Sequence, residues 1–238
     1  MKTRWQGHNL TVQPLFSRTG VATQILVSTD ELCFLWDCGD GATRDLIDTG
    51  VPPQSLSGVF LSHGHADHIG GLWGLLGYMR AMGRRPQFTV WYPKGSREVD
   101  ELLRAFQRAH AGDLPYELKV QSLSPGDEVV VGKVLVKAVG VKHRDSIAGV
   151  PGALAPAFGY LIEAGGERVA YTGDASPGPG LVELISGVDL ALIEATWDRA
   201  GPEGIHLSLD QAVELGKLAK RAFLIHRSDG QVLWLGEV

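Results

Sequence analysis

The chain has 238 residues, of which 44% are hydrophobic and 21% charged, and its formal net charge is −5. These values are typical of a globular protein with a sizeable core, and they exclude a disordered or collagen-like chain. An acidic balance also argues against a protein whose whole surface binds nucleic acid. Cys33 and Cys38 are too few for a disulfide framework, and the sequence shows neither a signal peptide nor a membrane span. We therefore expect one domain over residues 1–238, located in the cytoplasm.

Short apolar and β-branched runs recur along the chain and predict strands. In chain order they cover residues 23–28, 32–36, 58–62, 88–92, 133–141, 157–164, 167–173, 188–195, 222–226 and 231–237. Helices are predicted over residues 43–48, 68–82 and 96–110, and after Ser208, where Gln211 can complete a capping box. Two Gly/Pro-rich stretches, 149–159 and 176–180, are predicted to be loops. This order favours an α+β protein with two sheets and outer helices over a parallel Rossmann sheet.

The stretch "HGHADH" places several potential metal ligands directly after a predicted strand. His63 and His65 alternate along an extended segment, so their side chains can point the same way and share one metal ion. The chain then turns into a helix, which brings Asp67 and His68 to a second position. Imidazole nitrogen and carboxylate oxygen suit zinc and related divalent ions. An ordinary polar loop is the alternative, but so dense a cluster at a strand end favours a metal site.

"HGHADH" resembles the His-x-His-x-Asp-His signature of the metallo-β-lactamase superfamily, and the likeness extends from "FLWDCGDGATRDL" near residue 34 to "LIHRS" near residue 224. This resemblance implies a four-layer αββα sandwich with a one- or two-metal site at the rim of two sheets. It also implies further ligands at later strand ends, namely His143, Asp174 and His226. His110 is the competing histidine for the place of His143, but it lies at the end of a charged helix.

The resemblance thus assigns His63, His65 and His143 to one metal ion and Asp67, His68 and His226 to the other, with Asp174 between them. Two divalent cations in such a site can deprotonate a shared water near neutral pH, so the expected chemistry is hydrolysis by a metal-bridged hydroxide. Zinc is the expected metal, and manganese or iron would fit the same ligands.

Further segments resemble the phosphodiesterase branch of the superfamily, which includes the tRNA 3′-processing endonuclease tRNase Z. "DCGDGATRDL" is similar to a segment of that branch, and its Asp37 is expected either to bond a ligand imidazole or to end a strand. Glu194 and His206 match a couple that stands beside the metals there, where the histidine can protonate the leaving oxygen. The chain lacks the tRNA-clamping arm of the long processing enzymes, however. The resemblance therefore favours a small armless phosphodiesterase acting on a nucleotide or an RNA end.

Other functions stay open from the sequence. The same site could hydrolyse a lactone, thioester or β-lactam, although the Glu194–His206 couple disfavours this. A non-catalytic nucleic-acid-binding module is a third candidate, but its basic segments would be limited to residues 79–86 and 142–144. Trp73 and Trp197 are each candidates to wall the pocket or to pack in the core. A homodimer is possible, since the sequence is silent on oligomeric state.

Overall fold

The structure is a computed structural model that describes residues 3–236, so that Met1, Lys2, Glu237 and Val238 lie outside it. Within this range, the first half of the chain forms a sheet of seven strands. In spatial order, which is also chain order, they are β1 (Trp5–Gln6), β2 (Thr11–Arg18), β3 (Ala22–Ser28), β4 (Cys33–Trp36), β5 (Leu56–Phe60), β6 (Phe88–Pro93) and β7 (Leu118–Leu123). Strands β1 to β4 form an antiparallel meander, whereas β4 to β7 run parallel.

Parallel neighbours need crossover segments, which helices supply. The crossovers contain α1 (Ala42–Ile47), the 3₁₀ helix η1 (Pro53–Ser55), α2 (Ala66–Ile69), α3 (Leu72–Ala81) and α4 (Arg97–Ala109). In α4, Val99, Leu103 and Phe106 are buried at helical spacing, which fixes the face that packs on the sheet.

The second half of the described chain forms another seven-stranded sheet. Its strands are β8 (Glu128–Val131), β9 (Val134–Gly140), β12 (Phe158–Ala164), β13 (Glu167–Tyr171), β14 (Leu190–Glu194), β15 (Ala222–Ile225) and β16 (Leu233–Leu235). They lie in the order β16-β15-β14-β13-β12-β9-β8, and β13, β14 and β15 are parallel. Helices α5 (Pro179–Ile185) and α6 (Leu209–Gly216) make these crossovers. The predicted capping box is present in α6, where Ser208 and Gln211 bond reciprocally.

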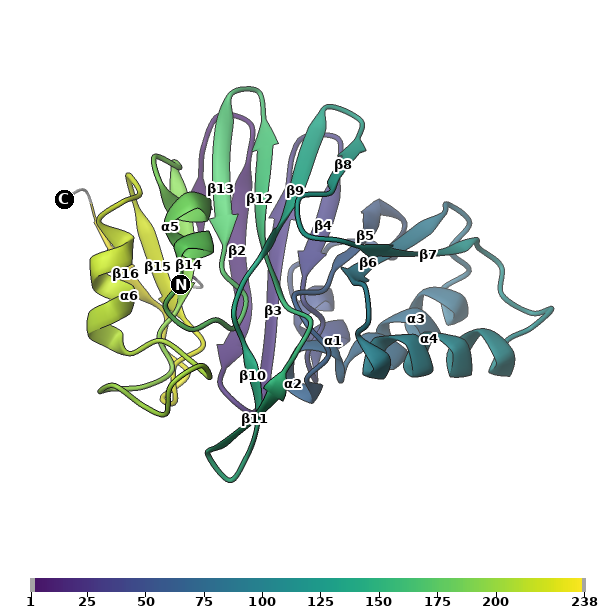
Figure 1. Ribbon diagram of the computed structural model, residues 1–238. Helices are drawn as coiled ribbons and strands as arrows, with labels where there is room; N and C mark the ends of the chain where they lie inside the picture. The colour runs from purple at the N-terminus through teal and green to yellow at the C-terminus, as the bar shows by residue number, and fades with distance from the viewer. Residues whose placement is uncertain (1–2, 237–238) are drawn as a thin grey trace.

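The two sheets pack face to face between two layers of helices (Figure 1). The central core joins both sheets: Trp36 of β4 stacks on Tyr171 of β13, with ring centroids 5.5 Å apart. Separate apolar layers lie beneath α1, α3 and α4 on one side and beneath α5 and α6 on the other. The predicted αββα sandwich is therefore confirmed. Among the described residues, no helix is long and apolar enough to cross a bilayer.

The structure differs from the predicted elements in several places. The helix expected over residues 68–82 is two helices, α2 and α3, divided at Gly70 and Gly71. The chain passes so close to Gly39 there that a Cβ on Gly71 would lie 2.0 Å from the Gly39 carbonyl oxygen. The stretch 176–180 is not wholly a loop, because α5 begins at Pro179, a residue suited to the first helical turn. Strand β2 was missed because Pro14 interrupts its pattern, and the register shifts beside it.

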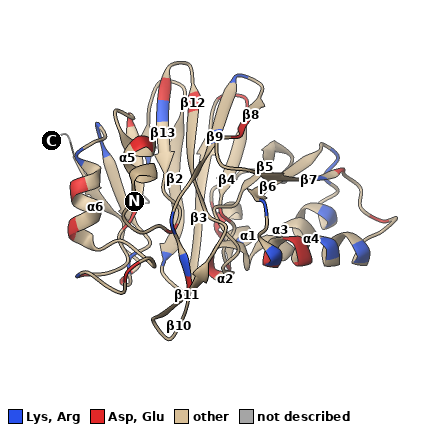
Figure 2. Ribbon diagram, viewed as in Figure 1, with Lys and Arg blue, Asp and Glu red and all other residues tan. Residues whose placement is uncertain are grey.

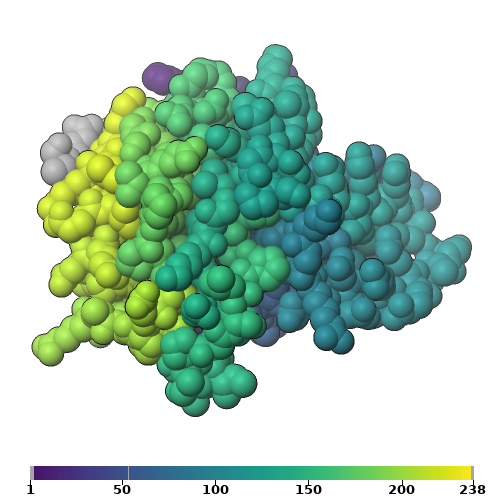
Figure 3. Space-filling model, in the orientation of Figure 1, coloured from purple at the N-terminus to yellow at the C-terminus, as the bar shows by residue number. Residues whose placement is uncertain are grey.

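The stretch 149–159 was also predicted to be a loop, but most of it is strand. Strands β10 (Arg144–Ile147) and β11 (Val150–Leu154) form a two-stranded hairpin. Its turn consists of Ala148, with a φ of 51°, and Gly149, with a φ of 78°. Residues 145–154 are all exposed, so no alternation of apolar and polar residues marked the strands. The hairpin projects from the lower edge of the molecule in Figures 1 and 3.

Candidate metal centre

The candidate ligands lie where strands of both sheets end. His63 and His65 follow β5, and His143 follows β9. Asp174 and His226 follow β13 and β15, whose parallel course brings their carboxyl ends to one edge. His63, His68, His143, Asp174 and His226 are all at most 2% exposed. Segments far apart in the sequence therefore meet at one rim of the sandwich.

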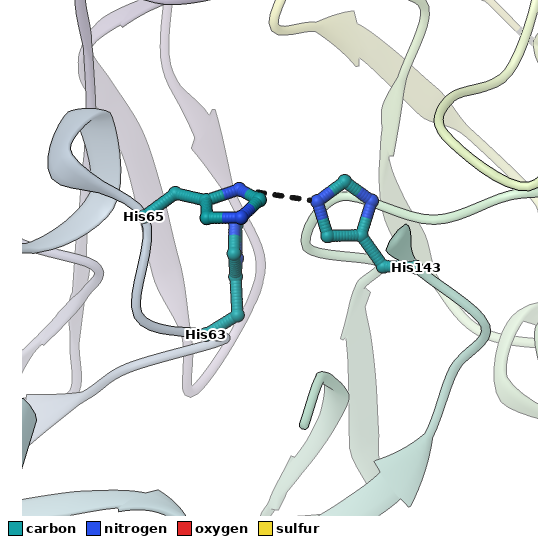
Figure 4. A group of neighbouring side chains, drawn as sticks. All are labelled: His63, His65 and His143. Carbon is teal, nitrogen blue, oxygen red and sulfur yellow. Dashed lines mark hydrogen bonds between the residues drawn. The ribbon is translucent and has the colours of Figure 1, made fainter. Parts of the chain in front are cut away.

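The first set of side chains, which we call the three-histidine group, consists of His63, His65 and His143 (Figure 4). One ligand atom from each lies within 4.8 Å of the others. His65 Nδ1 and His143 Nε2 approach each other to 3.3 Å. Burial and the neighbouring His68 hold the pKa of His63 well below its usual value, and burial lowers the pKa of His143. Neutral imidazoles of this kind are ready to bind a cation.

The second set, which we call the carboxylate group, consists of Asp67, His68, Asp174 and His226. Asp174 Oδ1 lies 3.3 Å from His68 Nε2, and Asp174 Oδ2 lies 3.9 Å from His63 Nε2 in the other group. Burial alone would raise the pKa of Asp174, but His226, His68 and His206 hold it well below its usual range. Asp174 thus stands as an anion between the two groups, where the sequence placed it.

The histidines are held by partners outside the two groups. His63 Nδ1 meets Ser62 Oγ at 3.0 Å, and His226 Nδ1 meets Thr196 Oγ1 at 2.9 Å. His143 Nδ1 donates to the Ile205 carbonyl at 2.7 Å. Such bonds fix which nitrogen is free to coordinate.

Asp37 bonds a ligand-type imidazole, that of His68, which is one of the two roles left open for it from the sequence. Its Oδ2 lies 2.7 Å from His68 Nδ1, and its carboxylate also accepts bonds from Ser62 and the Tyr171 hydroxyl. Asp37 is fully buried and has a φ of 56°, a conformation that an aspartate tolerates better than most residues. The Asp37 carboxylate therefore fixes the orientation of the His68 imidazole.

The donor set fits a divalent metal ion. His63 Nε2 is buried and has no hydrogen-bond partner among the described residues, and His68 Nε2 and Asp174 Oδ1, which lie 3.3 Å apart, make no well-directed hydrogen bond there. Buried polar atoms that are poorly satisfied are costly, so their convergence beside Asp174 indicates a ligand of positive charge.

Glu194 and His206 form the predicted couple. His206 Nδ1 lies 3.0 Å from Glu194 Oε1 and 3.7 Å from Asp174 Oδ2. Glu194 is fully buried at the end of β14, and its carboxylate accepts bonds from the Ala175 amide and the Thr196 hydroxyl. Burial opposes protonation of His206, but Glu194 and Asp174 outweigh it and raise its pKa to about 9. His206 is therefore held in its protonated form at neutral pH, beside the candidate ligands.

These residues open onto a cavity of about 650 Å³. Its lining includes Thr19, Gly20, His65, Asp67, His143, Ser146, Gly149, Asp174, Thr196, Trp197, Asp198, His206 and Ser228. Trp197 is thus a wall residue, with its ring centroid 5.8 Å from that of His206. Trp73 is not: it packs on Phe106 and His110 of the α4 end and is 42% exposed. No Lys or Arg of the described chain is among the lining residues.

Sequence reasoning missed the parts of the site that have no motif. Thr196, Ile205 and Asp145 bond candidate ligands, yet each is an ordinary residue in its local sequence. Ile205 accepts the bond from His143 through its backbone carbonyl, which every residue type has, so its side chain gave no signal in the sequence. The hairpin residues Ser146 and Gly149 also reach the cavity, and of these only Gly149 belongs to the stretch 149–159 that was predicted to be a loop.

Residues 34–226 match the model of the beta-lactamase superfamily domain. The chain is 30% identical over 198 residues to ribonuclease Z of Methanosarcina mazei, an alignment that covers 82% of this chain and 55% of that protein. It is 27% identical to ribonuclease Z of Methanosarcina acetivorans, covering 83% and 77%. The human tRNase Z short form has the same fold, with a TM-score of 0.75 at 24% identity over 93% of this chain and 98% of that one. The chain spans about half the length of the first of these relatives. The fold, the motif and these matches agree, and the chain belongs to the beta-lactamase superfamily, among relatives of ribonuclease Z.

Proposed function

We propose that this protein is a metal-dependent phosphodiesterase that binds two divalent cations, zinc in the first place. His63, His65 and His143 would hold one ion, Asp67, His68 and His226 the other, and Asp174 would contact both. The observation that carries this proposal is the convergence of the Glu194–His206 couple on Asp174, beside both ligand groups. Relatives that are ribonucleases Z support the same chemistry.

When bound, the ions supply a water deprotonated near neutral pH and neutralise charge on the phosphodiester. The chain's own part is to place and protonate the leaving group. His206 keeps its proton because Glu194 accepts a hydrogen bond from Nδ1. Its Nε2–H is then free to donate to the leaving oxygen, and such general acid catalysis contributes about 10²–10⁴-fold to the rate.

The cavity favours a small substrate or the end of an RNA. About 650 Å³ is enough for a nucleotide-sized group, and the lining includes Trp197 but no Lys or Arg among the described residues. A long RNA would need cations along its phosphates. The projecting structure between His143 and Asp174 is only the β10–β11 hairpin, in keeping with the armless enzyme that the sequence predicted.

A non-catalytic nucleic-acid-binding module is less well supported. Acidic and basic residues are interleaved along α4, as Figure 2 shows. Arg84, from the basic segment 79–86, is buried and donates to the carbonyls of Leu56 and Gln87. An ester or β-lactam hydrolase would use the same ligands, but would leave the Glu194–His206 couple without a function.

The test is hydrolysis by the zinc- or manganese-reconstituted protein of a panel containing bis(p-nitrophenyl) phosphate, cyclic nucleotides, precursor tRNA and p-nitrophenyl acetate. We expect cleavage of phosphodiesters, loss of activity on chelation and its return with metal. Equal rates before and after demetallation, or cleavage of the acetate ester alone, would contradict the proposal.

Two further expectations belong to this proposal. A single domain in the cytoplasm suits an enzyme of nucleotide or RNA metabolism, and cell fractionation tests the location. Sedimentation equilibrium tests whether the protein is a homodimer.

A further inference from the structure

One candidate metal ligand, His65, is held differently from the others. His63, His68, His143 and His226 each turn Nδ1 toward a buried partner from the body of the protein. His65 instead turns Nε2 outward, where it lies 2.6 Å from Asp145 Oδ1. Only Nδ1 of His65 is then left to face the three-histidine group, 3.3 Å from His143 Nε2.

Asp145 lies on the projecting hairpin, at the point where the pairing of β10 and β11 shifts register between Arg144 and Ser146. A bulge of this kind redirects a side chain away from the regular pattern of its strand. The Asp145 carboxylate is 54% exposed and the His65 imidazole, which lines the cavity, is 32% exposed, so the contact is open to solvent.

The hairpin has few other ties to the body of the protein. Its base is joined to the His143 carbonyl by the Ala155 amide, and the Arg144 guanidinium bonds within the hairpin to the Gly152 carbonyl. A two-stranded hairpin is marginally stable by itself, so the contact of its Asp145 with His65 adds to its order. Through His143 at the base and His65 by way of Asp145, the hairpin thus contacts two members of the three-histidine group.

We propose that Asp145 is a positioning residue that fixes His65 with Nδ1 toward the metal and thereby couples the β10–β11 hairpin to the three-histidine group. The inference rests on the proposed metal site. A carboxylate that accepts from the far nitrogen of a ligand histidine fixes its tautomer and ring orientation, and loss of such a partner weakens metal binding about 10- to 100-fold. Because coupling is reciprocal, metal binding should also order the hairpin.

The experiment measures zinc affinity by competition with a chromophoric chelator, for the wild type, Asp145→Ala and Asp145→Asn. We expect Asp145→Ala to lower the zinc affinity of one of the two sites about tenfold or more. Asp145→Asn should lower that affinity less, because its amide oxygen still accepts a hydrogen bond. Asp198→Ala is the matched control, since it removes an equal charge from the cavity lining. We expect its zinc affinity to remain that of the wild type.

Hydrogen exchange is the second readout. Zinc should slow amide exchange over residues 144–154 in the wild type and should have a smaller effect in Asp145→Ala. Wild-type protein that binds no zinc would refute the proposed metal site itself. Wild-type protein that binds zinc, with Asp145→Ala within twofold of it or with hairpin exchange indifferent to zinc, would refute the coupling alone.

Discussion

The two candidate ligand groups lie side by side but differ in charge. The three-histidine group offers nitrogen atoms only, and burial keeps His63 and His143 neutral. The carboxylate group contains two anions. Burial alone would raise the pKa of Asp67, but His226 and His68 lower it to about 2, and neighbouring histidines hold the pKa of Asp174 well below its usual range. Burial would deprotonate His68, yet Asp174 and Asp37 raise its pKa well above the usual value.

One fold thus holds two neighbouring ligand sets in different protonation states. The three-histidine group can take up a cation without releasing a proton from His63 or His143, whereas the carboxylate group must first lose the proton of His68. Asp174 and the Glu194–His206 couple join the two sets. Substitutions can therefore distinguish the residues that serve both groups from those that serve one.

Replacing the shared carboxylate should have the largest effect. Asp174→Asn removes the anion that lies near both His63 and His68, so we expect bound metal to fall and kcat/KM to drop on the order of 10³-fold or more. Metal analysis and steady-state kinetics measure the two quantities. Full metal content with activity within tenfold of the wild type would show that the groups act without Asp174.

His206→Ala should slow catalysis without emptying either group. We expect kcat to fall about 10²-fold or more because the proton donor is lost, while metal content stays that of the wild type. His226→Ala is the comparison, since it removes a member of the carboxylate group and should lower metal content. Equal metal loss in both variants would make His206 a ligand instead.

Glu194→Gln should change the pH profile. A raised pKa means that protonated His206 is present below that pKa and disappears as pH rises through it, so activity should decline on the alkaline side toward about 9. Without the Glu194 charge the pKa of His206 falls, and the alkaline limb of kcat should move to lower pH. An unmoved limb would assign it to another group.

Metal uptake by the two groups should respond differently to pH. Because the pKa of His68 is raised, the affinity of the carboxylate group should increase as pH rises toward that pKa, since less His68 is protonated. The three-histidine group should change less over the same range. Titration calorimetry in buffers of different ionisation enthalpy counts the protons released at each step. Equal proton release at both binding steps would show that the two groups do not differ in protonation.

The smallest effect is expected at the cavity wall. Trp197→Ala should raise KM for nucleotide diesters several-fold through lost stacking, which contributes about 1–3 kcal/mol per base, with metal content unchanged. Trp73→Ala is the matched control, because its ring packs on Phe106 away from the cavity. Its KM should equal that of the wild type, and a parallel rise would argue against base stacking at Trp197.

Much of the fold and site could be predicted because the signals are local. "HGHADH" follows a strand whose apolar residues mark it, and Ser208 with Gln211 marks a helix start without reference to the rest of the chain. The hairpin could not be predicted in this way, because all of residues 145–154 are exposed, the apolar Ile147, Val150 and Leu154 included, and no alternation of apolar and polar residues marks either strand. The division of α2 from α3 depends on the approach of Gly71 to Gly39, a distant segment.

The order of residues alone decides which chemical groups are available: imidazoles, carboxylates and no thiolate in the motif, at the ends of strands that their own apolar pattern defines. Tertiary structure decides which nitrogen of each histidine is free, whether Asp174 is an anion, and that Trp197 rather than Trp73 borders the cavity. The reason is physical. Hydrogen-bond partners, burial and neighbouring charge come from segments far apart in sequence, such as Asp145 for His65 and Ile205 for His143, and they meet only when the two sheets pack.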